Sequence, residues 1–335
     1  MKTSQLDDVD RQLLHALMLA PRAPFRQLAA VVGVSDQTVA RRYRKLADTA
    51  GLRVYGLIDG QRAGWVDWLV RLQAAPGSAQ RIADTLASRP DTRWVRLYSG
   101  GTEIVCTLQE RTPEQRNALF LHRLPGSRHV TAITSQMILH VFTPVAYVGY
   151  ASALSPPQVA ALREHAPEPP EAAPAPDTGN DSLPTGATVL RAEDDPLIAE
   201  LARDGRAPVA DMAAATHWHE STVRRRIEEL RRAGLLYFDI DVDDSVLGVN
   251  ATVMLWLRVE PTCLEAAGRA VAAHPEVPFA AATTGPTNLA VSAVFRGTRE
   301  LYAYLTTRLA DLPGLQSAET APIIGTMKRV GRRRA

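Results

Sequence analysis

The chain has 335 residues, of which 46% are hydrophobic and 22% charged, and its formal net charge is only +2. This composition is typical of packed globular domains and argues against a chain that is disordered overall. The apolar runs are shorter than the ~20 residues of a membrane helix, and the polar, acidic start of the sequence does not suit a secretory signal. We therefore expect a cytoplasmic protein that makes no membrane contact.

The two cysteines give no sign of a disulfide or a metal. Cys106 and Cys263 lie in strand-like surroundings, and neither belongs to a C-x-x-C pair or a Cys/His cluster. Free cysteines of this kind usually behave as small buried hydrophobic residues. We expect neither a metal nor a cofactor.

The sequence contains an internal repeat. The segment from Phe25 to Leu46 recurs as Val209 to Leu230, and residues 124–142 recur as 312–330. A nearly constant spacing across the whole chain indicates a tandem duplication. The functional unit is therefore expected to work in pairs.

Each copy begins with a pattern of short helices. In the first copy, apolar residues recur at helical spacing over 6–19 and again over 25–32, and Gly33 then permits a tight turn. Ser35 is a suitable N-cap for a third helix that buries Val39, Tyr43 and Leu46. The matching stripe in the second copy is Val223, Ile227 and Leu230. This order predicts two helix-turn-helix domains, and the plain alternative is a helical bundle with a solvated arginine face.

The exposed face of each third helix carries the candidate DNA-binding residues. The segment 35–46 has a net charge of +3 and the segment 219–232 has +2, which favours a polyanionic partner, double-stranded DNA. We expect base-edge contacts from Gln37, Arg41, Ser221 and Arg225, and phosphate contacts from Arg42, Arg44, Lys45, Arg226, Arg231 and the basic tail at 331–335. The complete candidate set is Ser35, Asp36, Gln37, Thr38, Arg41, Arg42, Arg44, Lys45, His219, Ser221, Thr222, Arg224, Arg225 and Arg226.

The turn of the second copy differs from that of the first. His217, Trp218 and His219 replace Gly33, Val34 and Ser35, so that both the glycine and the good N-cap are lost. Two histidines two positions apart do not share a helix face and have no third ligand nearby, so we expect no metal there. Trp218 is expected to fill the place of Val34. The second helix-turn-helix domain, or second reader, is therefore predicted to bind DNA more weakly than the first.

An α/β module follows each reader. The predicted order is strand, helix, strand, strand, helix, strand, at 66–74, 77–89, 92–98, 102–109, 113–123 and 129–142, and again at 250–260, 262–274, 277–284, 287–295, 298–311 and 316–329. This order defines a ferredoxin-like βαββαβ unit. Two helices cover one face of its sheet, and the bare face calls for a partner sheet. The fold class is therefore α+β, with two winged or plain helix-turn-helix domains and two ferredoxin-like domains in a pseudo-two-fold repeat.

The domain boundaries follow from a proline-rich segment. Residues 151–188 contain eight prolines and a net charge of −4, which predicts an extended linker, and 155–165 can form a short helix before it. We expect helix-turn-helix domains at 1–62 and 189–246 and ferredoxin-like domains at 63–150 and 247–330. The basic tail occupies 331–335.

These features resemble the Lrp/AsnC (feast/famine) family of transcription regulators. The resemblance rests on the L-D-x-x-D pattern of Leu6, Asp7 and Asp10 at the start of the first helix, on the S-x-x-T-V start of the third helix, and on the α/β module that follows. The third helix starts with Ser35, Thr38 and Val39. The second copy keeps Thr222 and Val223 at the equivalent helix start. In this family a single copy dimerises through its α/β module (the RAM domain). The resemblance implies that this chain is such a dimer fused into one polypeptide.

The resemblance also implies an effector site for an amino acid or another small molecule, near the turn between the second and third strands of each module. The residues there are Ser99, Gly100, Gly101 and Glu103 in the first copy, and Thr284, Gly285 and Asn288 in the second. The family's usual acid is replaced by Glu103 and Asn288, so that an altered or absent effector is an open alternative. Gly100 and Gly285 can equally serve only the turn.

Two other functions stay open. Relatives of the sirohaem decarboxylases are similar in architecture to this chain and also occur as paired or fused copies. If this chain were such an enzyme, the candidate residues around a tetrapyrrole would be His122, Arg123, His129, His140 and His274. An architectural DNA-binding protein without an effector is the third reading. The basic recognition helices favour a transcription regulator that is not an enzyme, and association into a higher homo-oligomer through the α/β modules is left open.

Overall fold

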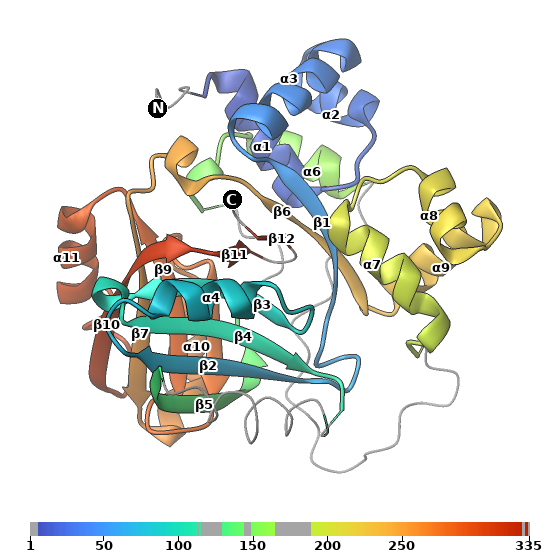
Figure 1. The fold of residues 1–335 in the computed structure, drawn as a ribbon. Helices are drawn as coiled ribbons and strands as arrows, with labels where there is room; N and C mark the ends of the chain where they lie inside the picture. Colours follow the sequence, from blue (N-terminus) through green and yellow to red (C-terminus); the bar gives the residue numbers. More distant parts are fainter. Residues whose placement is uncertain are drawn as a thin grey trace. The chain divides into compact units, whose positions relative to one another are not determined.

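The computed structural model describes residues 6–112, 114, 129–143, 149–164, 189–329 and 332–333 (Figure 1). The chain forms two compact units, and each unit is built from both copies of the repeat. Unit 1 comprises Met1–Ala63 and Pro144–Gly248, and unit 2 comprises Gly64–Thr143 and Val249–Ala335. The helix predicted at 113–123, apart from residue 114, and the linker from 165 to 188 lie outside the described residues.

Unit 1 holds the two predicted helix-turn-helix domains. The first consists of α1 (Asp8–Leu19), α2 (Phe25–Val32) and α3 (Asp36–Thr49), and the second of α7 (Asp195–Arg203), α8 (Val209–Thr216) and α9 (Glu220–Arg232). A short 3₁₀ turn, η4 (Ala192–Asp194), precedes α7. Asp7 caps α1 by accepting a hydrogen bond from the Asp10 amide. Gly33 ends α2 at a φ of +77°, in the left-handed region that suits glycine.

One strand after each third helix joins the two copies of unit 1. Strand β1 (Arg53–Ile58) pairs antiparallel with β6 (Leu236–Asp241), from Arg53 opposite Asp241 to Ile58 opposite Leu236. Each strand thus pairs with its counterpart rather than with a strand of its own copy. Helix α7 packs so closely on this ribbon that a Cβ at Gly56 would lie 2.8 Å from the Leu201 Cβ. The 3₁₀ turn η5 (Asp244–Leu247) follows β6.

The first residues of the predicted linker are folded. After η3 (Gly149–Ala151), helix α6 (Pro156–Arg163) contacts α1 and α2. The Gln158 amide nitrogen donates to the Val31 carbonyl at 2.7 Å, and the His15 Nδ1 accepts from the backbone N–H groups of Ala153 and Leu154 at 3.0 and 2.9 Å. The short helix predicted at 155–165 is confirmed. The extended segment that was expected from residue 151 therefore does not begin there, because η3 and α6 are folded against the first helix-turn-helix domain.

Unit 2 contains the two ferredoxin-like modules. The first has β2 (Val66–Ala74), α4 (Ala79–Ala87), β3 (Thr92–Tyr98), η1 (Ser99–Gly101), β4 (Glu103–Glu110) and β5 (Val130–Val141). The second has β7 (Ala251–Val259), η6 (Pro261–Cys263), α10 (Leu264–Ala272), β8 (Phe279–Thr283), β9 (Leu289–Phe295), α11 (Thr298–Thr306) and β10 (Leu315–Thr326). Near the end of the chain, β11 (Lys328–Arg329) pairs with β12 (Arg332–Arg333). The predicted element order is confirmed throughout the second module.

The two sheets of unit 2 close on each other. Their strands form one barrel in the order β10-β3-β4-β2-β5-β8-β9-β7, in which β5 pairs with β8 and β10 pairs with β3. Each pairing joins the last strand of one module to the second strand of the other. A shared core of both copies, which includes Leu69, Tyr98, Met254 and Trp256, lies on the faces opposite the helices. The sequence predicted that the uncovered face of each sheet packs against a second sheet, and that second sheet belongs to the other copy.

No helix among the described residues is long and apolar enough to cross a membrane. Cys106 is buried and Cys263 is half-buried, and both are free thiols. Burial raises the pKa of the Cys106 thiol to about 12.

Cutting the linker should leave the two copies associated, because strand pairs join them in both units. A protease site inserted after Pro174 allows the cut under native conditions. We expect the cleaved protein to elute in size-exclusion chromatography at the volume of the intact chain at micromolar concentration. Elution as two separate fragments would contradict the internal dimer.

Unit 1 should lose stability as pH falls below about 6.5, the ordinary pKa of histidine. Burial lowers the pKa of His15, and its Nδ1 accepts two N–H groups, so the folded state holds the neutral ring. The unfolded state then binds more protons between the lowered pKa and the ordinary one, and stability decreases as pH falls through that range. We expect the urea concentration at half-unfolding to be lower at about pH 5.5 than at about pH 7.5, two values on either side of the ordinary pKa of histidine. This decrease should be smaller in His15→Asn, because the asparagine Oδ1 can accept the same two hydrogen bonds and does not titrate. An equal decrease in the variant and the wild type would contradict the assignment of the pH dependence to His15.

Candidate nucleic-acid interface

Helix α3 presents most of its predicted DNA-binding residues to solvent. Ser35, Asp36, Gln37, Arg41 and Arg44 are exposed, whereas Thr38 is half-buried. The Ser35 hydroxyl accepts from the Thr38 amide at 3.2 Å, which caps the helix and fixes its start. On the opposite side Val39 and Leu46 are buried as predicted, and Tyr43 is half-buried under the Arg206 guanidinium. The residues at the start of this helix are thus in the position from which a recognition helix meets base edges.

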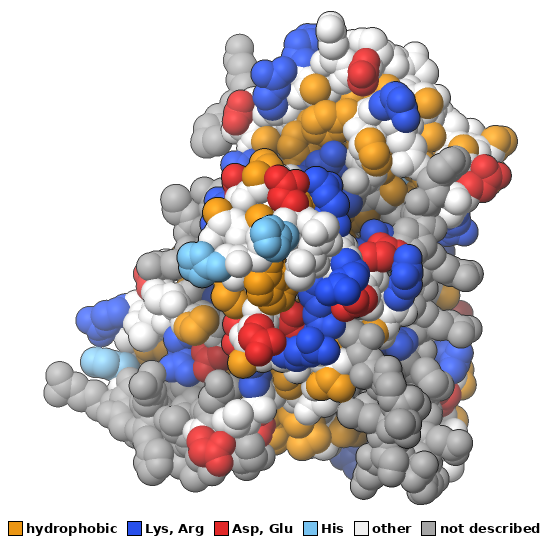
Figure 2. All heavy atoms as spheres, turned by 90° about the vertical axis from the view of Figure 1, so that its right-hand side faces the viewer, with side chains coloured by type: hydrophobic (Ala, Val, Ile, Leu, Met, Phe, Trp, Pro, Cys, Tyr) orange, Lys and Arg blue, Asp and Glu red, His pale blue; other side chains and the backbone are white. Residues whose placement is uncertain are grey.

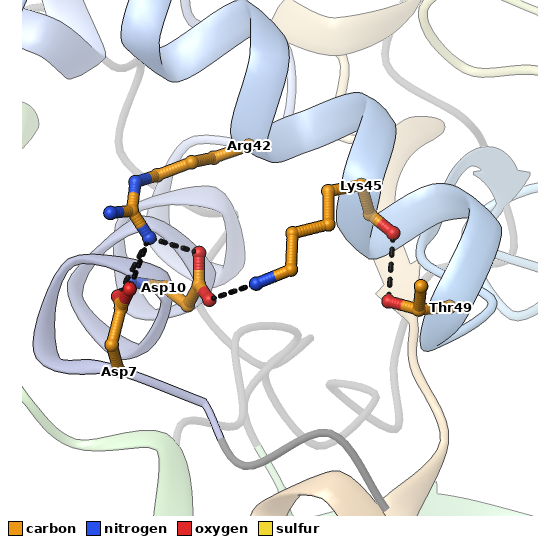
Figure 3. A network of polar contacts seen from close by, with 5 residues as sticks. All are labelled: Asp7, Asp10, Arg42, Lys45 and Thr49. Atoms are coloured by element: carbon orange, nitrogen blue, oxygen red, sulfur yellow. Dashed lines mark hydrogen bonds and ion pairs between the residues drawn. The ribbon is translucent and has the colours of Figure 1, made fainter.

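Arg42 has a different position from the one predicted. Its guanidinium bonds to the Asp7 carboxylate at 2.6 Å and to the Asp10 carboxylate at 2.8 Å, and Lys45 reaches Asp10 at 3.3 Å (Figure 3). Asp10 is only 1% exposed. The hydrogen bond that Arg42 donates holds the pKa of Asp7 below its usual value, and donation to the two carboxylates raises the pKa of Arg42. Arg42 therefore fastens α3 to α1, and its guanidinium is engaged by these two carboxylates instead of being available to a phosphate.

The second copy repeats this clamp, in which an arginine of the third helix binds a buried aspartate near the start of the domain. Arg226, which is equivalent to Arg42, donates to both oxygens of Asp194 at 2.8 and 2.7 Å and to the Val189 carbonyl at 2.8 Å. Its side chain is 9% exposed, and that of Asp194 is 1% exposed. Burial opposes ionisation of Asp194, but the hydrogen bonds from Arg226 outweigh it and keep the pKa below its usual value. Arg226 is thus also a structural residue. The sequence did not predict this role, because the helical spacing of apolar residues does not show which aspartate lies beside Arg42 or Arg226 in the fold.

The turn of the second domain has the weaknesses that its sequence predicted. His217 takes the left-handed conformation of Gly33, with a φ of +57°, which is strained for a residue with a side chain. His219 precedes α9 but makes no side-chain cap, unlike Ser35. Both histidines are exposed, while Trp218 is half-buried. In the part of the chain that the structure describes, no group of His, Cys, Asp or Glu could hold a metal.

The two recognition helices also differ in how their arginines are neutralised. On α9, Arg224 pairs with Glu220 at 2.9 Å, Arg225 with Glu229 at 3.6 Å and Arg232 with Glu228 at 3.1 Å. On α3, the exposed Arg41 and Arg44 make no ion pair with any described residue, and Arg44 donates only to the Ala40 carbonyl. Figure 2 shows the side of the molecule with α8 and α9, where basic and acidic side chains alternate. Ser221 is exposed on α9 and Thr222 is half-buried.

The predicted effector residues of the first module contact the second module. Glu103 is 1% exposed and forms an ion pair with Arg71, and the Ser99 hydroxyl donates to Glu103 at 3.0 Å. Arg71 in turn bonds to Glu319 on β10, and its guanidinium lies 5.2 Å from the centre of the Trp256 ring. Gly100 and Gly101 both have a positive φ, so the turn itself requires them.

The predicted effector residues of the second module are likewise bonded within the protein. Gln136, on β5 of the first module, donates to the carbonyls of Thr284 and Thr287 at 2.8 and 2.7 Å. Its amide nitrogen would lie 2.7 Å from a Cβ at Gly285, so only glycine leaves room for it. The Asn288 amide bonds to both backbone groups of Val259, each at 2.8 Å. Gln136 of the first copy thus bonds directly to the predicted region of the second module, whereas Glu319 of the second copy bonds to Arg71, the ion-pair partner of Glu103.

The three described candidate residues for tetrapyrrole chemistry, His129, His140 and His274, have separate local contacts. His274 is hydrogen-bonded to the Tyr304 hydroxyl at 3.0 Å, and the His140 ring packs edge-on against Phe142. Burial lowers the pKa of His274. The backbone carbonyl of His129 accepts from the Ala75 amide. His122 and Arg123 lie outside the described residues.

Fold and site together define a protein with two helix-turn-helix domains and two paired ferredoxin-like domains. The AsnC-type helix-turn-helix domain matches this sequence at residues 6–47 and 194–231, and the Lrp/AsnC ligand binding domain matches it at 252–332. The chain therefore belongs to the Lrp/AsnC family, as a tandem duplication, and is a DNA-binding regulator of this type. The resemblance seen in the sequence is confirmed.

Two regulators of known sequence each match a length of about one copy, whereas two solved structures of one enzyme match nearly the whole chain. The HTH-type transcriptional regulator FL11 of Pyrococcus horikoshii is 26% identical over 136 residues, which cover 40% of this chain and 89% of FL11. The regulator AldR of Mycolicibacterium smegmatis is 27% identical over 143 residues, covering 41% and 84%. The crystal structure of the siroheme decarboxylase NirDL covers 97% of this chain and 93% of its own, with 16% identity and a TM-score of 0.60. At this identity the likeness concerns the fold alone.

Removing the buried arginine should destabilise unit 1 strongly. We expect Arg226→Ala to lower the free energy of unfolding by about 3–5 kcal/mol, because it leaves Asp194 buried without its partner. Arg225→Ala is the matched control, since Arg225 is 74% exposed and its loss should cost at most about 1 kcal/mol. Urea unfolding measures both. A similar, small effect of the two substitutions would argue against the clamp.

Proposed function

We propose that this regulator binds one DNA duplex with both of its helix-turn-helix domains and reads two different half-sites. The observation that carries the proposal is the pairing of β1 with β6, which places α3 and α9 in the same compact unit. A pair of readers with two-fold symmetry selects a palindrome. Here the two readers differ in sequence, so the operator should be an imperfect palindrome.

The exposed residues divide into two kinds of contact. Gln37 and Arg41 on α3, and Ser221 and Arg225 on α9, are the proposed base-edge contacts, because they lie exposed on the first turns of their helices. Arg44 is the proposed phosphate contact of the first reader, since no carboxylate among the described residues neutralises it. The second reader should contribute less affinity, because each of its proposed contact arginines shares its charge with a glutamate of α9.

A second proposal is that DNA binding by this chain does not depend on an amino acid effector. It is supported by Gln136, which bonds to the predicted effector region of the other copy, and by Glu103, which is buried in an ion pair with Arg71. Melting of the protein with each proteinogenic amino acid, followed by duplex titrations, tests this. A rise in melting temperature together with altered duplex affinity would favour an effector. A tetrapyrrole absorbance band with turnover would instead favour the enzyme whose fold the chain shares.

Selection of bound duplexes from a random pool should yield an operator with two unlike halves. Arg41→Ala is expected to relax base preference in one half-site, at a cost of about 1–3 kcal/mol if the arginine contacts a guanine with two hydrogen bonds. Arg225→Ala should affect the other half-site, and less strongly. Footprints of the two variants on the selected operator measure this. Equal loss over both halves from either variant would mean that two chains bind in a symmetric arrangement.

A further inference from the structure

The second helix-turn-helix domain contains a cavity of about 220 Å³ beside its recognition helix. It lies between η4 and α9, and the residues that matter for its chemistry are Arg191, Glu193, Trp218, Thr222, Arg225 and Arg226. Two of these, Thr222 and Arg225, are also candidate DNA contacts. A ligand in this cavity would therefore touch the surface that is proposed to read DNA.

Comparison of the two copies explains why this space is open. In the first copy the Asp7 carboxylate lies against the Arg42 guanidinium at 2.6 Å and fills the equivalent position. In the second copy Arg226 replaces Arg42, but Arg191 replaces Asp7. Two guanidinium groups repel each other and cannot form that ion pair. The second domain has thus kept the arginine but has no acid at the position of Asp7, and the additional carboxylate on Arg226 comes instead from Glu229, at 3.2 Å.

Three arginines and three carboxylates line the cavity, so an anion is favoured by the unused donors of two arginines and not by a net positive charge. Asp194 and Glu229 are already bonded to Arg226, whereas Arg191 forms no ion pair with any described residue. Arg225 is 74% exposed, and its one ion pair, with Glu229, is 3.6 Å long. Each guanidinium carries five N–H donors, so unused donors remain around the cavity. Glu193 is the opposing charge, and no ion pair with the described part of the chain neutralises it.

We propose that this cavity is a binding site for an oxyanion, which takes the place that the Asp7 carboxylate fills in the first copy. Arg191 and Arg225 bind the anion, and Thr222 and Trp218 line the same cavity. A phosphate group fits this chemistry, either as a free anion or as a phosphate of bound DNA. The oxyanion site rests on this domain alone, whereas its occupation by DNA also rests on the proposed function.

Inorganic phosphate tests the site in the full-length protein. Incorporation of fluorotryptophan gives five ¹⁹F resonances for the five tryptophans, and Trp218→Phe identifies that of Trp218. We expect phosphate at constant ionic strength to shift this resonance in a saturable way. Arg191→Asp, which recreates the first copy's ion pair, should abolish the shift. Glu193→Gln, which removes the opposing charge, should lower the phosphate concentration at half-saturation severalfold.

The same variants distinguish the two sources of the anion. If a DNA phosphate occupies the site, Arg191→Asp should flatten the salt dependence of duplex affinity by about 0.9 in log–log slope. If a free anion occupies it, that slope should stay unchanged, and phosphate should weaken duplex binding by the wild type but not by Arg191→Asp. A chain that binds no duplex would refute the proposed function while the ¹⁹F titration still tests the cavity.

Two results would overturn the oxyanion site. One is a Trp218 resonance that responds to chloride and phosphate alike, because that response reports only screening. The other is no response to phosphate together with unchanged duplex binding by Arg191→Asp. Thermal melting of each variant, and the uncharged variant Arg191→Gln as a second substitution, separate loss of the site from loss of the fold.

Discussion

Reciprocal strand pairing between the two copies is the constraint on which the structure depends. Neither copy completes its own sheets: β1 needs β6, β5 needs β8, and β10 needs β3. The apolar faces opposite the helices are buried only when the two modules share one core, which includes Trp256 and Tyr98. Covalent linkage makes this association independent of protein concentration, unlike that of a homodimer, whose stability depends on protomer concentration.

The two clamps show how the same backbone can be held by different charges. Each recognition helix uses one arginine, Arg42 or Arg226, to bind a buried aspartate at the start of its domain. The additional charges are exchanged: Asp7 and Lys45 assist in the first copy, whereas Glu229 assists in the second. A buried ion pair of this kind contributes little over an apolar pair, but breaking it is costly. The clamp therefore fixes the position of each helix rather than adding much stability.

The repeat, the element order and the buried helix stripes could be predicted from the sequence because they depend on periodicity. Val223, Ile227 and Leu230 are buried as the helical spacing indicated, and β2 and β3 have the predicted limits. The fate of the arginines could not be predicted in this way. Arg42 and Arg41 are neighbours of the same type, yet one bonds to Asp10 from 32 positions away and the other is exposed. Periodicity shows which face is apolar, but the pairing of charges requires knowledge of which segments meet. The same limit applies to Gln136, whose contacts lie 148 and 151 residues away.

The departures from the repeat that concern DNA recognition are concentrated in the second helix-turn-helix domain. His217 is strained where the first copy has Gly33, His219 does not cap its helix, and the arginines of α9 pair with glutamates of the same helix. The cavity beside Arg191 also belongs to this domain. In a homodimer every such change would appear in both readers at once. Duplication removes that restriction, because α3 can keep Gly33 at its turn, and an Arg41 and an Arg44 that form no ion pair with a described residue, while α9 changes. The strand pairs that hold the copies together involve none of these residues. The DNA-contacting residues of the second reader can therefore change without loss of the pairing between the two copies.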